Sequence, residues 1–249
     1  MDQFIDKIPH VLVLYTALLF SLSLHEASHA TSAHLLKDDT AKKLGRMTLN
    51  PAAHISLVGT VIFPLLGLFT GWPFIGWAKP VPVDPRNLST KSKRFGYALV
   101  SAAGPGSNLV LMLFFLPVAA LLARSLGGAS LSHRGDIFYA GLTANLGALS
   151  DLGLSAGQSV LMALTGTLVL INLLLAFFNM IPVAPLDGGG VIRGLLPWRL
   201  LPKWDKFQPY MIVVLLILVL TPLGNFLFAP VYWIANHFVL PAASLILGA

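Results

Sequence analysis

Charged residues are missing from five long stretches of this sequence, and those gaps constrain its fold more than any other feature. They cover residues 8–25, 47–78, 95–123, 152–186 and 207–249. A helix needs about 20 apolar residues to cross a bilayer, and four of the five gaps are longer than that. Only 10% of the residues are charged, against roughly 25% in a soluble domain. We therefore predict an all-α polytopic membrane protein and exclude a soluble nucleic-acid-binding protein, despite the net charge of +6.

The first apolar stretch extends as a helical span over residues 11–36, because no proline interrupts it and its residues tolerate helix. A cleaved signal peptide is the alternative reading. The residues before the stretch lack the positive charge that such peptides carry, so we expect the span to be retained. One membrane domain, residues 1–249, should hold this span, two more core spans at 95–123 and 160–180, and two short spans within 208–247.

Residues 55–83 do not fit one straight helix. Prolines and glycines interrupt the apolar part, and residues 77–83 read as extended chain because each proline disfavours helix for itself and its predecessor. Lys and Arg concentrate in cytoplasmic loops, and thirteen of the sixteen lie in residues 37–46, 79–94 and 193–206. These loops share one face only if region 55–83 re-enters the membrane or forms a hairpin. We predict that arrangement, in a plasma membrane, with the N-terminus outside.

The segment His25-Glu-Ala-Ser-His29 carries the strongest chemical signal. On a helix, residues i and i+4 lie on one face, so both imidazoles can bind one zinc ion while Glu26 lies beside the metal-bound water. Glu26 is the only glutamate in the chain, and chance would produce this pattern roughly once in a thousand shuffles. The alternative is a polar cluster or proton relay inside a transporter. The spacing favours zinc.

Two histidines leave a catalytic zinc one protein ligand short, because such sites use three ligands plus water. The chain has no cysteine, and Glu26 cannot be a ligand if it acts as the base. Asp187 is the candidate: it follows 35 uncharged residues, and the prolines and glycines around it can turn its carboxylate back into the bundle. An ordinary turn residue is the alternative reading. The predicted arrangement of the loops favours a ligand role for Asp187, since it brings the C-terminal ends of spans 11–36 and 160–180 to one face of the membrane.

Three motifs now stand in order along the chain: HEASH at 25–29, AGPGSN at 103–108, and Asn179 followed by a Pro-rich turn into Leu186-Asp187-Gly-Gly. Together they resemble the site-2 protease family of intramembrane zinc metalloproteases. The resemblance implies a three-helix catalytic core, one zinc held by His25, His29 and Asp187, Glu26 as general base, and Asn179 contacting substrate or its oxyanion. It also implies an active site that opens toward the cytoplasm, and strands near residues 77–83 that pair with substrate.

This sequence departs from some members in having neither a PDZ-like insertion nor a CBS-type extension. The implied partners are a transmembrane protein substrate and the lipid bilayer, with no nucleic acid; the oligomeric state is left open. Rival readings are a cation transporter, a non-catalytic scaffold, and a metallohydrolase for lipids or small peptides. We expect Asn108 to serve helix packing through a hydrogen bond to a neighbouring helix, and Gly104 and Gly106 to permit close helix approach. We expect His34 to lie off the metal face and His54 to be an ordinary interfacial histidine, the alternative being a partner of the site or a substrate contact.

Overall fold

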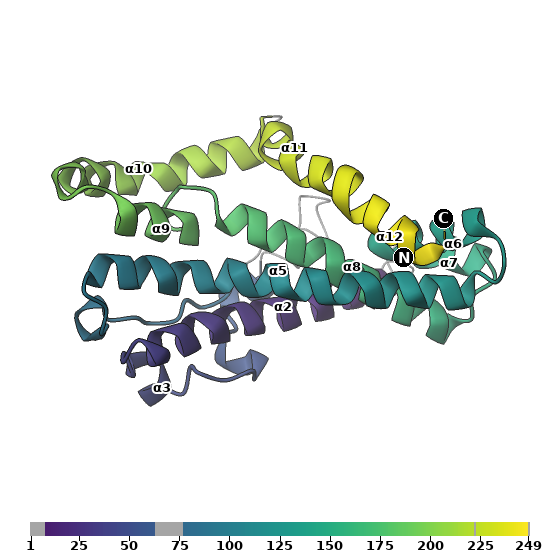
Figure 1. Ribbon diagram of the computed structural model, residues 1–249, viewed down its shortest axis with the longest axis horizontal. Helices are drawn as coiled ribbons and strands as arrows, with labels where there is room; N and C mark the ends of the chain where they lie inside the picture. The colour runs from purple at the N-terminus through teal and green to yellow at the C-terminus, as the bar shows by residue number, and fades with distance from the viewer. Residues whose placement is uncertain (1–7, 63–76, 222, 249) are drawn as a thin grey trace. The chain divides into compact units, whose positions relative to one another are not determined.

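The computed structural model describes residues 8–62, 77–221 and 223–248. Within these residues the regular structure is helical and contains no strand. Four helical segments of this part of the chain are long and apolar enough to cross a membrane: α2 (Ile8–Leu35), α5 (Lys93–Leu126), α8 (Ala156–Asn179) and the segment Gly224–Leu247 (Figure 1). The prediction of an all-α polytopic membrane protein is confirmed.

The chain divides into two compact units. One comprises Met1–Ser21, Leu109–Leu174 and Phe228–Ala249, and the other comprises Leu22–Asn108 and Leu175–Leu227. Helices α2, α5 and α8 each contribute one part to each unit.

The first unit adds short helices to its parts of the long ones: α6 (Leu131–Leu142), α7 (Leu146–Asp151), most of α11 (Gly224–Ile234), the π-helix η5 (Ala235–Val239) and α12 (Leu240–Leu247). Two arginine side chains cap the C-terminus of α12. Arg124 donates a hydrogen bond to the Ile246 carbonyl at 2.9 Å, and Arg134 donates one to the Leu247 carbonyl at 2.6 Å. Helix C-termini favour such donors because their last carbonyls have no partner in the helix.

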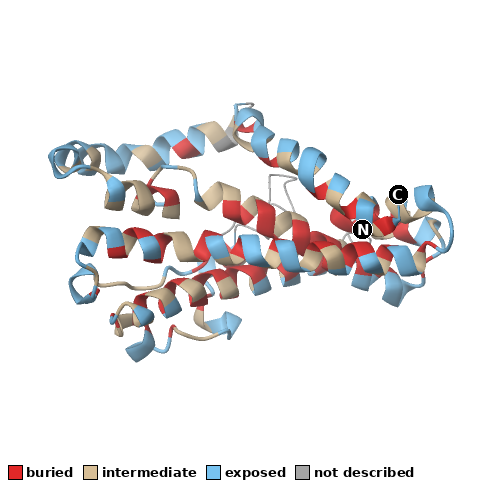
Figure 2. Ribbon diagram, in the orientation of Figure 1, coloured by how far each residue is buried: buried red, intermediate tan, exposed pale blue. Residues whose placement is uncertain are grey.

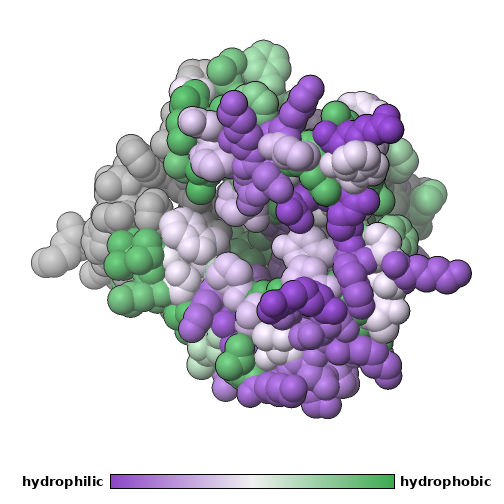
Figure 3. All heavy atoms as spheres, turned by 90° about the vertical axis from the view of Figure 1, so that its left-hand side faces the viewer, coloured by the Kyte–Doolittle hydropathy of each residue, from purple (hydrophilic) through white to green (hydrophobic). Residues whose placement is uncertain are grey.

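The second unit contains the chemistry-bearing motifs. It holds the C-terminal part of α2, the start of α5, α3 (Thr40–Lys43), α9 (Asp187–Leu195), α10 (Leu201–Leu220), the π-helix η2 (Leu57–Ile62), and three short 3-10 turns, η1 (Pro51–Ala53), η3 (Pro85–Asn87) and η4 (Trp198–Leu200). All three Lys/Arg-rich segments belong to this unit. Figure 3 looks onto the end that carries α9 and the start of α5, and hydrophilic side chains gather there.

Helix boundaries differ from those expected in a consistent way. α5 begins at Lys93, α8 at Ala156 and α10 at Leu201, each a few residues before the apolar stretch. Hydropathy finds the part of a helix that suits lipid, whereas lysine and similar residues extend a helix readily. The short helices α6 and α7 were not anticipated. The expected break near residue 222 is present, because α10 ends at Leu220 and α11 starts at Gly224.

Region 55–83 is described only at its two ends. Residues 57–62 form η2, and residues 77–84 have no regular structure. Residues 63–76 lie outside the described residues, so the re-entrant or hairpin path stays a prediction.

Burial separates α8 from the other spans. In α8, 61% of the apolar membrane-spanning stretch is buried, against 39% in α2 and 28% in α5. Figure 2 shows buried residues along α8 and exposed ones along α10. α8 is therefore the most enclosed of the four candidate spans, and its last residue leads into the turn that carries Asp187.

Candidate metal centre

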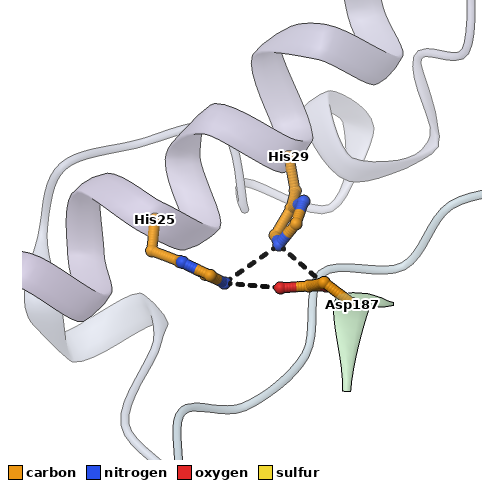
Figure 4. A group of neighbouring side chains, drawn as sticks. All are labelled: His25, His29 and Asp187. Atoms are coloured by element: carbon orange, nitrogen blue, oxygen red, sulfur yellow. Dashed lines mark hydrogen bonds and ion pairs between the residues drawn. The ribbon is translucent and has the colours of Figure 1, made fainter. Parts of the chain in front are cut away.

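Three side chains from two helices of the second unit converge on one point (Figure 4). The Nε2 atoms of His25 and His29 are 3.1 Å apart. The Asp187 carboxylate lies 3.0 Å from His25 Nε2 through Oδ2 and 3.2 Å from His29 Nε2 through Oδ1. Both histidines are buried and Asp187 is half-buried. The i, i+4 spacing has placed the two rings on one face of α2, as the sequence predicts.

The Nδ1 atom of each imidazole forms a hydrogen bond, which fixes the direction in which the Nε2 atom points. His25 Nδ1 donates to Asn108 Oδ1 at 2.6 Å, and His29 Nδ1 donates to the Val100 carbonyl at 2.7 Å. Both acceptors belong to α5. A neutral imidazole carries one proton, so with Nδ1 protonated each Nε2 presents a lone pair to the shared point. Ligating histidines in metal sites are held in this manner.

Gly104 keeps the centre open on the α5 side. A Cβ atom at this position would lie 2.3 Å from His29 Nε2 and 2.6 Å from His25 Nε2, well inside van der Waals contact. Any side chain would therefore fill the space at which the two nitrogens point. Gly106 differs, because a Cβ there meets nothing within 4 Å; the expectation that it serves close helix approach is wrong for the described residues.

Asp187 reaches the centre because α9 packs closely against α5. A Cβ at Gly190 would lie 2.4 Å from Ser101 Oγ, and one at Gly194 would lie 2.5 Å from Ala98 Cβ. These two glycines are four residues apart, so they form one face of α9. Asp187 is the first residue of that helix, where the partial positive charge of the N-terminus favours a carboxylate.

The Asp187 carboxylate is ionised at neutral pH. Burial acts to raise the pKa of Asp187, but hydrogen bonds from His25 and His29, donated when their Nε2 atoms carry a proton, outweigh burial and bring the pKa down to about 2. Carboxylate and neutral imidazole are the forms that bind a metal ion.

The donor set and its spacing fit zinc. A tetrahedral ion with bonds of about 2.0–2.1 Å separates neighbouring ligand atoms by roughly 3.3 Å. The two Nε2 atoms are 3.1 Å apart, and each lies 3.0 or 3.2 Å from one oxygen of the Asp187 carboxylate, which is close to that value. Two imidazoles and one carboxylate leave one tetrahedral position open, the pattern of catalytic rather than structural zinc sites.

The two remaining candidate residues lie in the same unit. Glu26 is 8% exposed and accepts a hydrogen bond from the Val81 backbone N–H through Oε2 at 3.0 Å. Asn179 is the last residue of α8, and its Nδ2 donates to the Leu175 carbonyl in its own helix at 3.0 Å. The structure thus gathers the three expected ligands, whereas the Asn179 amide is turned back onto α8.

Sequence reasoning missed some of the groups around the centre. Asn108 was expected to hydrogen-bond to a neighbouring helix as part of helix packing; its partner is His25, whose ring it orients. The Val100 carbonyl and the Val81 N–H are backbone groups, which carry no signal in a sequence. His34 pairs with Asp39 at 2.5 Å, and His54 is buried with Nε2 bonded to the Thr48 carbonyl at 2.8 Å.

Comparisons with known proteins agree with this centre. Residues 13–222 match peptidase family M50. The chain is 34% identical over 236 residues to the Bacillus subtilis (strain 168) protein named "Putative zinc metalloprotease YwhC", covering 92% of this chain and 90% of that one. It is 27% identical over 217 residues to "Putative zinc metalloprotease Rip2" of Mycolicibacterium smegmatis, covering 86% and 70%. No solved structure matches. The chain therefore belongs to peptidase family M50, the site-2 protease family.

Proposed function

We propose that this protein is an intramembrane zinc metalloprotease that hydrolyses peptide bonds in or near the transmembrane segments of membrane proteins. The observation that carries the proposal is the convergence of the ligand atoms of His25, His29 and Asp187 within 4.8 Å of one another. The names of its relatives, both of which begin "Putative zinc metalloprotease", support zinc as the ion. We assign one zinc per chain, with α2, α5 and α8 as the catalytic core.

Zinc bound at this centre supplies Lewis acidity, which lowers the pKa of water toward about 7 and polarises a scissile carbonyl. The chain's own residues do the rest. His25 and His29 are held by Asn108 and the Val100 carbonyl, so their lone pairs need no reorientation when the ion binds.

Glu26 is assigned the proton transfer. Its carboxylate takes a proton from the attacking water and returns it to the nitrogen of the leaving amine. Asn179 is assigned to the substrate or its developing oxyanion. One of its two amide N–H groups bonds to Leu175, which leaves the other as a donor.

The substrate and its setting follow from the surroundings of the centre. A transmembrane helix satisfies its own amides, so hydrolysis requires local unwinding. We place the protein in the plasma membrane with its active site toward the cytoplasm, because the unit that holds the centre also holds thirteen of the sixteen Lys and Arg residues.

Comparative membrane proteomics tests this function. In cells that carry Glu26→Gln, single-span membrane proteins should accumulate that are cut in wild-type cells.

Purified Glu26→Gln should keep its zinc, whereas Asp187→Asn should lose it, as measured by metal analysis after detergent purification. Equal cleavage by Glu26→Gln would remove the base assignment, and undiminished zinc in Asp187→Asn would remove that ligand. Metal flux in liposomes, with no proteolysis, would favour a transporter instead.

A further inference from the structure

Residues 77–84 form an irregular segment of the second unit that is fastened at both ends; we refer to it as the strap. At one end, the Lys79 N–H donates to the His54 carbonyl at 2.8 Å and Arg46 Nη2 donates to the Lys79 carbonyl at 2.5 Å. At the other end, the Asp84 N–H donates to Asp38 Oδ2 at 2.8 Å. Arg46, His54 and Asp38 are all buried. The path of the strap is thus set by hydrogen bonds to buried residues.

The strap contacts the proposed base between these two fastenings. Its middle reads Pro80-Val81-Pro82, and the Val81 N–H donates to Glu26 Oε2 at 3.0 Å. Proline has no N–H, so Val81 carries the only backbone donor in this tripeptide. A donor that stands alone between two prolines cannot be replaced by a neighbour if the chain shifts by one residue.

The two prolines also fix where that donor points. Each locks its own φ near −65°, and each restricts the residue before it to extended conformations. Lys79, Pro80, Val81 and Pro82 are therefore all restricted before any tertiary contact forms. The Val81 amide is presented to Glu26 by a stiff segment rather than by a flexible loop.

The hydrogen bond from Val81 holds the Glu26 side chain in one orientation. A glutamate side chain has several rotatable bonds, and ordering it costs rotamer entropy. Anchoring Oε2 fixes the carboxylate and leaves Oε1 to face a water proton. A buried carboxylate also needs a donor to compensate for lost hydration, and the strap supplies one without introducing a second charge beside the metal centre.

We propose that the Val81 backbone N–H, held between Pro80 and Pro82, is a positioning group that orients the Glu26 carboxylate for proton transfer. This rests on the proposed function, because it presupposes Glu26 as the base. It assigns to the strap a direct role in the orientation of the base, distinct from any role in pairing with substrate.

A spectroscopic test is available because Glu26 is the only glutamate in the chain. Protein made by cell-free synthesis with ¹³C-carboxyl glutamate carries one labelled carboxylate, whose infrared band reports this site alone. Val81→Pro removes the N–H while keeping an extended backbone, and Val81→Ala trims the side chain but keeps the N–H. We expect the antisymmetric carboxylate band to move to higher wavenumber in Val81→Pro and to stay in place in Val81→Ala. An unmoved band in folded Val81→Pro overturns the proposal.

A second measurement uses a chain that keeps its native backbone, so it does not depend on the folding of a proline variant. With ¹³C-carboxyl glutamate and ¹⁵N-valine, solid-state NMR should detect a dipolar contact between the Glu26 carboxyl carbon and one valine nitrogen. The contact should vanish in Val81→Ala, which replaces that nitrogen's label. Its absence from the unsubstituted protein would refute the hydrogen bond directly.

Kinetics then separate positioning from a merely structural role. With a fluorogenic single-span peptide as substrate, kcat of Val81→Pro should fall on the order of 10- to 100-fold below that of Val81→Ala, with KM and zinc content alike in the two. Equal kcat values would overturn the positioning role and leave the protease function standing. Cleavage by Glu26→Gln would instead show that the base itself is wrongly assigned.

Discussion

Gly104→Ala offers the sharpest test of the metal centre, since one methyl group is added at the point where the two histidines aim. The new Cβ would stand 2.3 Å from His29 Nε2 and 2.6 Å from His25 Nε2. Ordinary contact between a methyl carbon and a nitrogen requires about 3.4 Å or more, so each ring must move by roughly 1 Å. Neither ring can do so while its Nδ1 keeps its partner on α5.

The size of the effect follows from those two hydrogen bonds. Losing one outer partner of a ligating histidine costs roughly 10- to 100-fold in metal affinity. Displacing both rings should therefore weaken zinc binding by at least about 100-fold. Gly106→Ala is the matched control, because it makes the same change two residues further along α5 where an added Cβ meets nothing within 4 Å. Both substitutions favour helix by up to about 1 kcal/mol, so neither should prevent folding.

Chelator competition on the detergent-purified proteins measures the zinc affinity, and circular dichroism monitors the fold. We expect Gly106→Ala to match the wild type and Gly104→Ala to hold little or no zinc at chelator concentrations that the wild type withstands. If the two variants bind zinc within a few-fold of each other, the ion does not sit between these histidines, and the reasoning from Gly104 fails.

Two further predictions concern the surroundings of the centre. Asn108→Ala should weaken zinc binding roughly 10- to 100-fold by releasing His25 Nδ1, whereas Asn172→Ala, which removes a buried hydrogen bond to Ser21 in the other unit, should lower thermal stability and leave zinc affinity as it is. Equal zinc loss in both would point to general destabilisation. Asp38 gives a pH prediction: burial raises the pKa of its carboxyl, but hydrogen bonds from Asn87, Thr40 and the Asp84 N–H prevail and lower it. Its contribution is present above its unfolded pKa of about 3.9 and is lost as the pH falls through the lower folded value. Asp38→Asn should thus cost about 2 kcal/mol at pH 7 and progressively less toward pH 3 in thermal unfolding; a pH-independent difference would contradict this.

The sequence predicts the common face of the two histidines because helical periodicity acts over short distances. His25 and His29 are four residues apart on a helix with no proline, so their common face follows from the backbone alone. Asp187 is 158 residues away from His29. It could be assigned only because zinc needs a third ligand and because the basic loops are expected on one side of the membrane. The structure brings it to the histidines through glycines of α9 that lie against α5, a contact that no local pattern encodes.

Other features depend on groups that a sequence does not reveal. Every residue has a backbone carbonyl and every residue except proline has an N–H, so the roles of Val81 and Val100 depend on tertiary placement. Gly104 and Gly106 lie in one motif and look equivalent, but only Gly104 faces the histidines. The short helices α6 and α7 carry Arg134, Asp136 and Asp151, and such charges hide a helix from a search for apolar runs.

The close seating of α9 on α5 has a thermodynamic consequence. Asp187 is the first residue of α9, so whatever displaces this helix from Ala98 and Ser101 also withdraws one of the three proposed ligands of the ion. Binding of the ion and docking of α9 must then favour each other by the same free energy. Removing the ion with a chelator should raise amide hydrogen exchange first in residues 188–195. A substrate segment that displaces α9 from α5 would lower the affinity of the protein for the ion.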